Sequence, residues 1–331
     1  MKYDLITIGG ATEDLAIYTD EGILINNKKD ILRQKLLAFE YGAKVKVDKA
    51  DHTLGGGAIN AAICLSRLGF NVAAMVAVGN DDRGKRIINN LKKEKVKTKL
   101  IQIIKNEISG FTASIISQDN EHVSFPIRGA NTRLLITDSN LRQIKKADWL
   151  YLTSLSGDKK AWLASLDKIF SSEKVKIAWN PGHLQLIEGK KTLNKYLKKT
   201  ELLIVNIDEA RELIISDKKY SSNKSAFFDD TKKLLEIIKQ WVPGTVVITE
   251  GKKGASAIDA ANKFYKISSN SSVKQINTVG VGDAFGSSLV AGLKLYKGDI
   301  LKAMELGKKN TASVITKAGA QTGLIYKKDI L

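Results

Sequence analysis

Cysteine, proline and histidine are scarce in this chain. Its 331 residues include one cysteine, three prolines and three histidines. A single cysteine, Cys64, cannot form a disulfide within the chain, and a low cysteine content is typical of proteins from a reducing compartment. The N-terminus runs from a short apolar segment straight into glycine, without the basic region and cleavage site of a targeting peptide. We therefore expect a cytoplasmic protein.

Long apolar runs and clustered metal ligands are also missing. No stretch approaches the roughly 18 uninterrupted apolar residues of a membrane span, so the sequence predicts no membrane partner. His52, His122 and His183 lie far apart, without the ligand spacing of a zinc site. The chain has neither the G-x-S-x-G elbow of many hydrolases nor a Walker A loop.

Acidic residues are outnumbered, with 35 against 53 lysines and arginines, which gives a formal net charge of +18. Such a balance fits nucleic acid, an anionic membrane or phosphorylated substrates. The lysines are spread widely, and the densest runs are 92–99 and 190–199. Because no zinc-finger spacing or RNA-recognition motif accompanies them, they indicate a solvated lysine-rich surface and not a nucleic-acid footprint.

Short apolar runs alternate with helical patterns along most of the chain. Several of these runs are apolar throughout, as is typical of strands buried on both faces. This rhythm predicts an α/β fold, in which helices cover both faces of a doubly wound, mostly parallel sheet. The predicted strands are 3–9, 72–79, 149–155, 175–180, 202–206 and 245–250, and the predicted helices are 58–68, 82–94, 209–215 and 231–241.

Two regions, at about 12–54 and 107–128, depart from this rhythm. They contain alternating segments such as KVKVDK, FTASIIS and HVSFPIR, which indicate half-exposed strands. A small β-sheet lid beside the main sheet accounts for both regions. No linker separates two halves, so we expect a single domain over residues 1–331.

A glycine-rich turn that ends in an acid, Gly280-Val281-Gly282-Asp283, precedes an apolar helical run. The N-terminus of a helix offers unpaired amides, and glycines let the backbone approach an anion closely. These four residues therefore form a candidate phosphate site. Asp283 is also a favourable N-cap residue, and that structural reading stays open.

A second glycine run, Gly55-Gly56-Gly57, leads into a helical pattern with Asn60 in its first turn. A turn followed by a helix start explains part of this pattern, with Asn60 helping to cap the helix. Three successive glycines exceed what a cap needs, so we expect something to approach the backbone there.

Two further stretches follow buried strands. Asn206 and Glu209 have the spacing of a capping box, yet they also lie at the carboxyl end of a strand, where open α/β sheets bind ligands. Both readings stay open. Asp14 follows the first strand in a polar loop and is unremarkable alone.

Taken in order, these stretches resemble the ribokinase-type (phosphofructokinase-B-type) carbohydrate kinase family over nearly the whole chain. LGGGAINAAICLSRLG is similar to the first family signature, in which a glycine pair and an asparagine lead into a helix. NTVGVGDAFGSSLVAGL is similar to the second, usually D-T-x-G-A-G-D. The segments VVITEGKKGA and NTASVITKAGAQTGL resemble its nucleotide-side regions.

The resemblance implies a doubly wound α/β domain with a β lid, and phosphoryl transfer from ATP to a hydroxyl group. In that chemistry Asp283 takes the proton of the acceptor hydroxyl as general base, while Gly280, Val281 and Gly282 with Asp283 form the anion hole.

Further roles are carried over by the same resemblance. The residues implied to bind substrate are Asp14, Gly56, Gly57, Asn60 and Arg128. Those implied to bind the nucleotide are Asn206, Thr249, Gly251, Thr278, Asn310 and Gly319. Asn206 and Glu209 are implied to organise Mg²⁺ through water, since this ion keeps much of its hydration shell.

One departure from the family pattern affects the cations. Asn277 stands where the second signature usually begins with aspartate, a position that helps to bind a monovalent cation. An amide can still coordinate K⁺ but brings no charge, so the sequence leaves activation by K⁺ open.

Three functions remain as alternatives. The leading one is an ATP-dependent sugar kinase, and the second is a nucleoside kinase whose lid aromatics line a base pocket. The third is a nucleic-acid-binding or regulatory protein on a kinase-like scaffold. The resemblance also implies a homodimer formed through the lids. The aromatics available for a base pocket are Tyr18, Phe39, Tyr41, Phe111 and Phe125.

Overall fold

An eight-stranded sheet forms the centre of the molecule. A computed structural model of the chain describes residues 2–26, 35–117, 122–172, 174–222, 225–269 and 278–330. The strand order of this sheet is β16-β15-β14-β13-β12-β11-β1-β6, and all neighbours from β14 to β6 run parallel. The strands are β1 (Leu5–Ile8), β6 (Val72–Met75), β11 (Trp149–Leu152), β12 (Lys176–Trp179), β13 (Leu202–Asn206), β14 (Thr245–Thr249), β15 (Ala255–Ile258) and β16 (Phe264–Ile267).

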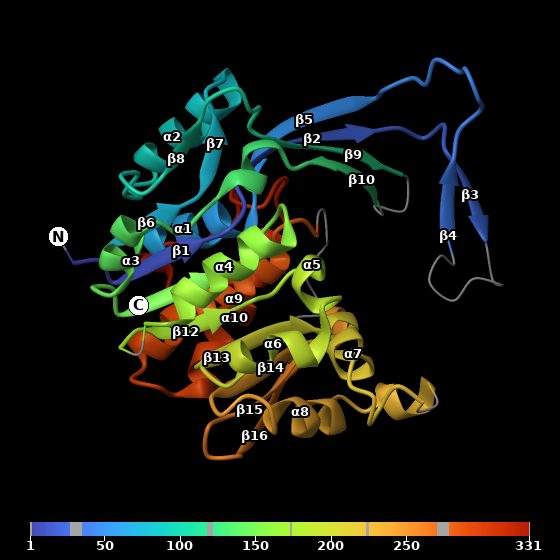
Figure 1. The fold of residues 1–331 in the computed structure, drawn as a ribbon. Coiled ribbons are helices and arrows are strands. Elements are labelled where there is room, and N and C mark those ends of the chain that lie inside the picture. Colours follow the sequence, from blue (N-terminus) through green and yellow to red (C-terminus); the bar gives the residue numbers. More distant parts are fainter. Residues whose placement is uncertain are drawn as a thin grey trace.

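Both faces of this sheet are buried under helices (Figure 1). Strand β1 illustrates why its sequence is apolar throughout. Leu5 packs into one core cluster, whereas Ile6 and Ile8 pack into the other, because successive side chains of a strand point to opposite faces. The prediction of a doubly wound α/β fold is therefore confirmed.

Helices α1, α2, α9 and α10 contribute to the cluster on the face of Leu5, and helices α3 to α8 to the cluster on the opposite face. Figure 1 shows α9 and α10 lying side by side, and they share the most extensive helix contact in the molecule's described part. The helices are α1 (Gly57–Arg67), α2 (Asp82–Lys93), α3 (Asp138–Ile144), α4 (Lys159–Phe170), α5 (His183–Leu186), α6 (Gly189–Leu197), α7 (Ile207–Ile215), α8 (Thr231–Lys239), α9 (Val281–Leu295) and α10 (Ile300–Val314).

Short 3₁₀ helices complete the connections between these elements. Several helices begin at an aspartate whose carboxylate accepts backbone N–H groups of the first turn, as Asp81 does from Gly84 at 2.8 Å. The 3₁₀ helices are η1 (Gly129–Arg133), η2 (Ser225–Asp229), η3 (Gly251–Lys253) and η4 (Lys327–Asp329).

A second, four-stranded sheet projects from the main body as a lid (Figure 1). Its order is β10-β9-β2-β5, with β2 parallel to β9 and antiparallel to β5. A hairpin of β3 and β4 lies beyond its far end. These strands are β2 (Thr12–Tyr18), β3 (Ile23–Asn26), β4 (Lys35–Ala38), β5 (Lys49–Gly55), β9 (Gly110–Ile116) and β10 (His122–Ile127).

The single strand predicted over 72–79 is in fact two strands. After β6, the chain leaves the main sheet, and β7 (Ala77–Gly79) pairs instead with β8 (Gln102–Ile104) in a small parallel sheet. All residues of both β6 and β7 are buried, so hydropathy alone could not mark the break.

None of the helices in the described part of the chain is long and apolar enough to cross a membrane.

Candidate active site

The glycine turn that the sequence marks as a phosphate site leads into α9. The residue before α9, Gly280, has a left-handed backbone with φ of 77°. A Cβ at this position would lie 2.3 Å from Cβ of Ala320 and 2.8 Å from its Cα. The turn into α9 therefore requires glycine, both for its backbone angle and for its contact with the C-terminal segment.

Asp283 lies in the first turn of α9, and its carboxylate meets α1. Asn60 Nδ2 donates a hydrogen bond of 2.8 Å to Asp283 Oδ2. Burial raises the pKa of the Asp283 carboxyl, the Asn60 hydrogen bond lowers it, and the charge of Asp14 raises it further. The structure thus brings together three predicted site residues that are far apart in sequence.

Asp14, on lid strand β2, lies close enough to this carboxylate for their charges to interact. Burial raises its pKa, while hydrogen bonds from Thr12 and Thr112 lower it. A Cβ at Gly55 would lie 2.0 Å from Asp14 Oδ2, so the absence of a side chain at Gly55 makes room for the carboxylate.

The other two glycines of this run also serve internal packing. A Cβ at Gly56, where φ is 100°, would lie 2.6 Å from the carbonyl oxygen of Gly10. A Cβ at Gly57 would lie 3.1 Å from the side chain of Thr153. The expected close approach to the backbone is therefore made by the protein's own atoms, and it places α1 against the ends of β1 and β11.

Asn206 and Glu209 form the capping box that their spacing allows. Asn206 Oδ1 accepts the N–H groups of Asp208 and Glu209 at 3.0 and 2.9 Å, and Glu209 Oε2 accepts the N–H of Asn206 at 2.8 Å. Burial raises the pKa of Glu209, the hydrogen bond from the Asn206 N–H lowers it, and the charges of Glu212, Asp208 and Asp283 raise it further. Glu209 thus faces the same acidic site while it caps α7.

The structure places the predicted nucleotide residues in different surroundings. Thr249 ends β14 and pairs with Asn206 of β13. Thr278 and Gly251 are exposed, and Gly251 has φ of 56° with no protein atom within 4 Å of an added Cβ. Gly319 has φ of 76° and lies against Thr53 of lid strand β5.

Asn310 differs from these residues because it is fully buried. Its Nδ2 donates to Ser288 Oγ at 2.6 Å, and its Oδ1 accepts the N–H of Ile325 at 3.0 Å. Full burial argues against a direct contact of the Asn310 side chain with the nucleotide, since both ends of the amide tie α9, α10 and the C-terminal segment together.

Arg128 is exposed where lid strand β10 ends and η1 begins. Asn277, the predicted monovalent-cation ligand, lies outside the described residues. Among the residues that are described, no group of three or more His, Cys, Asp or Glu side chains is placed to hold a metal ion.

A comparison with protein families decides what kind of protein carries this site. Residues 27–326 match the model of the pfkB family carbohydrate kinases. The chain belongs to this family.

Relatives and solved structures agree with this assignment. The chain is 26% identical over 285 residues to a ribokinase of Haemophilus influenzae, covering 84% of this chain and 86% of that one. It superposes on Arabidopsis thaliana ribokinase, solved with ribose and ATP, with a TM-score of 0.78 at 15% identity, over 100% of this chain and 98% of that one. A Burkholderia thailandensis nucleoside kinase, solved with inosine, gives a TM-score of 0.78 at 17% identity over 98% and 96%.

The pfkB carbohydrate kinases are phosphotransferases that use an alcohol group as acceptor, and this chain is such an enzyme. The predictions of the family and of the enzyme class are thereby confirmed.

Two residues near the site of this pfkB kinase were not predicted. Gln321 contacts Asn60 through its side-chain amide. Tyr151 of β11 is fully buried, and its hydroxyl has no hydrogen-bond partner among the described residues. Its pKa is raised well above the usual value by burial, and then by the charges of Asp283, Cys64 and Glu209. The sequence did not single out Tyr151, because a tyrosine fits the apolar pattern of the strand predicted over 149–155.

Gly286 allows α9 to approach this tyrosine closely, one turn after Asp283. A Cβ at Gly286 would lie 2.2 Å from Tyr151 Oη. We expect Gly286→Ala to push α9 outward, to cost about 1–3 kcal/mol of stability and to lower kcat by displacing Asp283. Thermal unfolding of Gly286→Ala, Tyr151→Phe and the double variant tests this. Tyr151→Phe removes the clashing oxygen, so the double variant should recover most of the lost stability, and purely additive effects would contradict the explanation.

Proposed function

We propose that this enzyme transfers the γ-phosphoryl group of ATP to a hydroxyl group of a sugar, with Asp283 as the general base. Asp283 is half-buried, hydrogen-bonded and close enough to Asp14 for their charges to interact. Its raised pKa favours proton uptake, which a general base needs, while the charged form still holds the Asn60 hydrogen bond.

The turn before Asp283 supplies the proposed anion hole. Gly280, Val281 and Gly282 bring their amides to the positive end of the α9 dipole. Val281 N–H also donates to the carbonyl oxygen of Thr278, at a long 3.4 Å. An added Cβ at Gly282 would meet no protein atom within 4 Å, which leaves room for a phosphoryl group beside the carboxylate.

The polarity of the lid is the observation that favours a sugar. Residues paired across the lid sheet share one face, and Asp14 pairs with both Thr53 and Thr112. Farther along the same face Ser114 pairs with Ser124, and their hydroxyl oxygens lie 2.8 Å apart. Because this face carries Asp14, it is turned toward Asp283, and its hydroxyl and carboxylate groups suit a polyol.

Of the aromatics suggested for a nucleoside pocket, Tyr18 shares this face with Asp14, whereas Phe111 and Phe125 do not. Phe111 pairs with Glu13 and Phe125 with Ala113, so the register places both on the opposite face. The guanidinium of Arg83 already stacks on the Phe111 ring, 4.6 Å from its centroid. Tyr41 is fully exposed. Tyr18 lies four residues beyond Asp14, whereas the residues paired with Asp14 carry hydroxyl groups, so the surroundings of Asp14 favour a sugar acceptor over a nucleoside.

The donor set around the site fits a nucleotide with Mg²⁺. We assign Gly251, Thr249, Thr278 and Gly319 to the nucleotide. Gly251 and Thr278 are exposed, Thr249 is half-buried at the end of β14, and Gly319 precedes Ala320, which lies against Gly280 of the anion-hole turn. Asn206 and Glu209 would hold Mg²⁺ through water, because their capping bonds leave one carboxylate oxygen of Glu209 without a hydrogen bond among the described residues. When bound, Mg²⁺ would offset the charge of the phosphates. K⁺ remains a prediction that rests on Asn277.

The apolar face of the lid supports the homodimer implied by the resemblance. Val123, Phe125 and Ile127 of β10 are 39%, 54% and 50% exposed on that face. A second lid would cover such a surface. The mass of the wild-type protein in solution tests this arrangement.

An acceptor panel tests the proposed function. ADP release from Mg²⁺-ATP should depend on a sugar when pentoses, hexoses, sugar phosphates and nucleosides are offered, with and without K⁺. The polar lid face predicts that free sugars or sugar phosphates are used and nucleosides are not. Release with nucleosides alone would replace the sugar proposal by the nucleoside alternative.

A further inference from the structure

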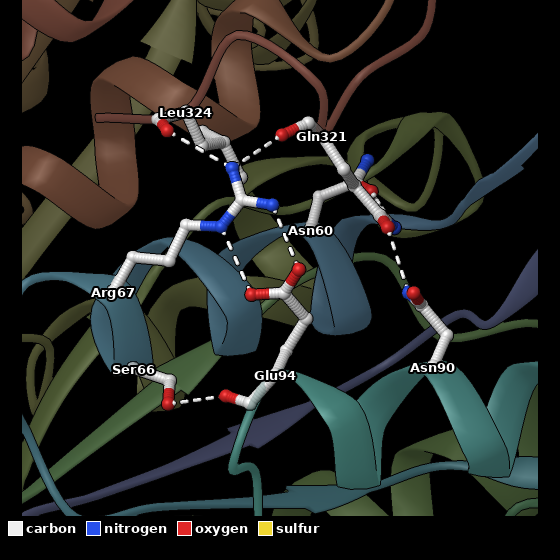
Figure 2. Close-up of polar contacts among 7 residues, drawn as sticks. All are labelled: Asn60, Ser66, Arg67, Asn90, Glu94, Gln321 and Leu324. Atoms are coloured by element: carbon white, nitrogen blue, oxygen red, sulfur yellow. Dashed lines mark hydrogen bonds and ion pairs between the residues drawn. The ribbon is translucent and has the colours of Figure 1, made fainter. Parts of the chain in front are cut away.

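Three side-chain amides, those of Asn90, Gln321 and Asn60, lead from helix α2 to the proposed base Asp283. Figure 2 shows the three amides. Asn90 Nδ2 donates to Gln321 Oε1 at 2.9 Å, and Gln321 Nε2 donates to Asn60 Oδ1 at 2.9 Å. Asn60 Nδ2 then donates to Asp283 Oδ2 at 2.8 Å. These three hydrogen bonds join α2, the C-terminal segment, α1 and α9.

The direction of each of these hydrogen bonds follows from the last acceptor, the carboxylate of Asp283. An ionised carboxylate only accepts hydrogen bonds, so Asn60 must turn its N–H group toward Asp283. The oxygen of Asn60 then needs a donor, because the side chain is only 3% exposed. Gln321 supplies that donor, and Asn90 fixes the orientation of Gln321 in the same way.

The backbone around Gln321 is held independently of its side chain. Arg67 Nη1 donates to the carbonyl oxygens of Gln321 and Leu324, both at 2.9 Å (Figure 2). Glu94 fixes the guanidinium through two bonds of 3.0 and 2.8 Å. The side chains of Arg67 and Glu94 are only 11% and 16% exposed, so this ion pair is well shielded.

The neighbours of Gln321 contact the rest of the site. Gly319 lies against Thr53 of the lid, and Ala320 lies against Gly280 of the proposed anion hole. Three successive residues of the C-terminal segment therefore meet the lid, the anion-hole turn and the amide that contacts the base.

We propose that Gln321 is a positioning residue, which holds the Asn60 amide with its N–H group on Asp283 and so keeps the base ionised and in place. The role of Asp283 as base belongs to the proposed function, on which this inference rests. The other titratable groups around Asp283 are Asp14 from β2, Glu209 from α7 and Tyr151 from β11. None of these brings a positive charge, so the Asn60 amide is the side chain that favours the charged form of Asp283, beside the positive end of the α9 dipole.

Two substitutions of Gln321 separate this role from packing. Gln321→Leu removes the donor to Asn60 without adding charge. Gln321→Glu replaces the donor by an acceptor, so Asn60 is expected to turn its oxygen toward Asp283, which then binds a proton more tightly. We expect Gln321→Leu to raise the pKa of Asp283 by about one unit, and Gln321→Glu to raise it more.

A thermal-unfolding cycle measures this change without a substrate. The Tm of each protein is compared with that of its Asp283→Asn counterpart across pH. The gain in Tm from Asp283→Asn is absent at low pH, grows above the pKa of an unfolded aspartate, and levels off at the folded pKa of Asp283. In the Gln321→Leu background, the plateau should begin about one pH unit higher than in the background that keeps Gln321. An unchanged plateau would overturn the inference.

The acid limb of the pH profile of kcat gives a second readout. It separates the role of Asp283 as general base from the role of Gln321 as a positioning residue. It should move to higher pH in Gln321→Leu and farther in Gln321→Glu. Glu94→Gln, which loosens the same segment through Arg67, should lower Tm without moving the limb. If Asp283→Asn keeps its activity, the proposed base is wrong and the inference falls with it. If Asp283→Asn is inactive and the limb stays in place, only the role of Gln321 is wrong.

Discussion

Asp283→Asn is expected to lower kcat by about 10²–10⁴-fold, the range that general acid–base catalysis contributes. An amide cannot take the proton of the acceptor hydroxyl. It can still accept the hydrogen bond that Asn60 donates to Asp283, so substrate binding and the fold should survive. Steady-state kinetics with the acceptor found in the panel measures the loss, and a variant that keeps most of its kcat would contradict the assignment.

The same variant should be more stable than the wild type at neutral pH. Because burial raises the folded pKa of Asp283, the proton is bound more tightly in the folded than in the unfolded protein. The stability due to this group is therefore fully present below the unfolded pKa and is lost as pH rises through the folded pKa. The uncharged amide of the Asp283→Asn variant avoids that loss. Lost activity combined with a higher Tm at neutral pH indicates that the carboxylate is kept for chemistry at a cost in stability.

Gly280→Ala is expected to have the second largest effect. The methyl group would collide with Ala320, and a non-glycine residue at φ of 77° is strained. The turn must shift and carry the amides of the proposed anion hole with it. Removal of one such donor typically costs about 10²–10³-fold in kcat, and we expect a fall of that order together with a lower Tm.

Two other glycines serve as matched controls for Gly280. Gly298, between α9 and α10, has φ of 91° with no protein atom within 4 Å of an added Cβ. Gly298→Ala should therefore lower Tm through backbone strain without a comparable loss of kcat. Gly282→Ala meets no protein atom and should keep its Tm, but lose activity if a phosphoryl group occupies that space. Equal losses of kcat in Gly280→Ala and Gly298→Ala would indicate strain alone.

Much of this fold can be predicted from the sequence, because the patterns that indicate its strands and helices are local. Apolar runs mark strands buried on both faces, and alternation marks the strands of the lid. The turn from Gly280 to Asp283 consists of four successive residues, so it can be recognised from the sequence alone. The sequence could not predict that β2 pairs in parallel with β9, since such a pairing joins segments about a hundred residues apart.

The site beyond these motifs depends on contacts between distant segments. Asn310 was expected near the nucleotide, yet its buried amide ties two helices to the C-terminal segment. The run from Gly55 to Gly57 led us to expect a close approach to the backbone, and only the structure shows that Asp14, Gly10 and Thr153 lie where side chains at these positions would point. Gln321 was missed because its partners, Asn60 and Asn90, lie more than two hundred residues away.

The most direct test of the proposed reaction is to follow the phosphoryl group itself. ATP labelled with ¹⁸O at its terminal phosphoryl oxygens is offered with Mg²⁺ and each acceptor of the panel, and the acceptors are analysed by mass spectrometry. We expect a sugar to gain a labelled phosphoryl group on its own hydroxyl oxygen with the wild-type enzyme, and to gain none with Asp283→Asn. Label that appears only in inorganic phosphate, or a sugar phosphorylated equally well by both proteins, would contradict the account.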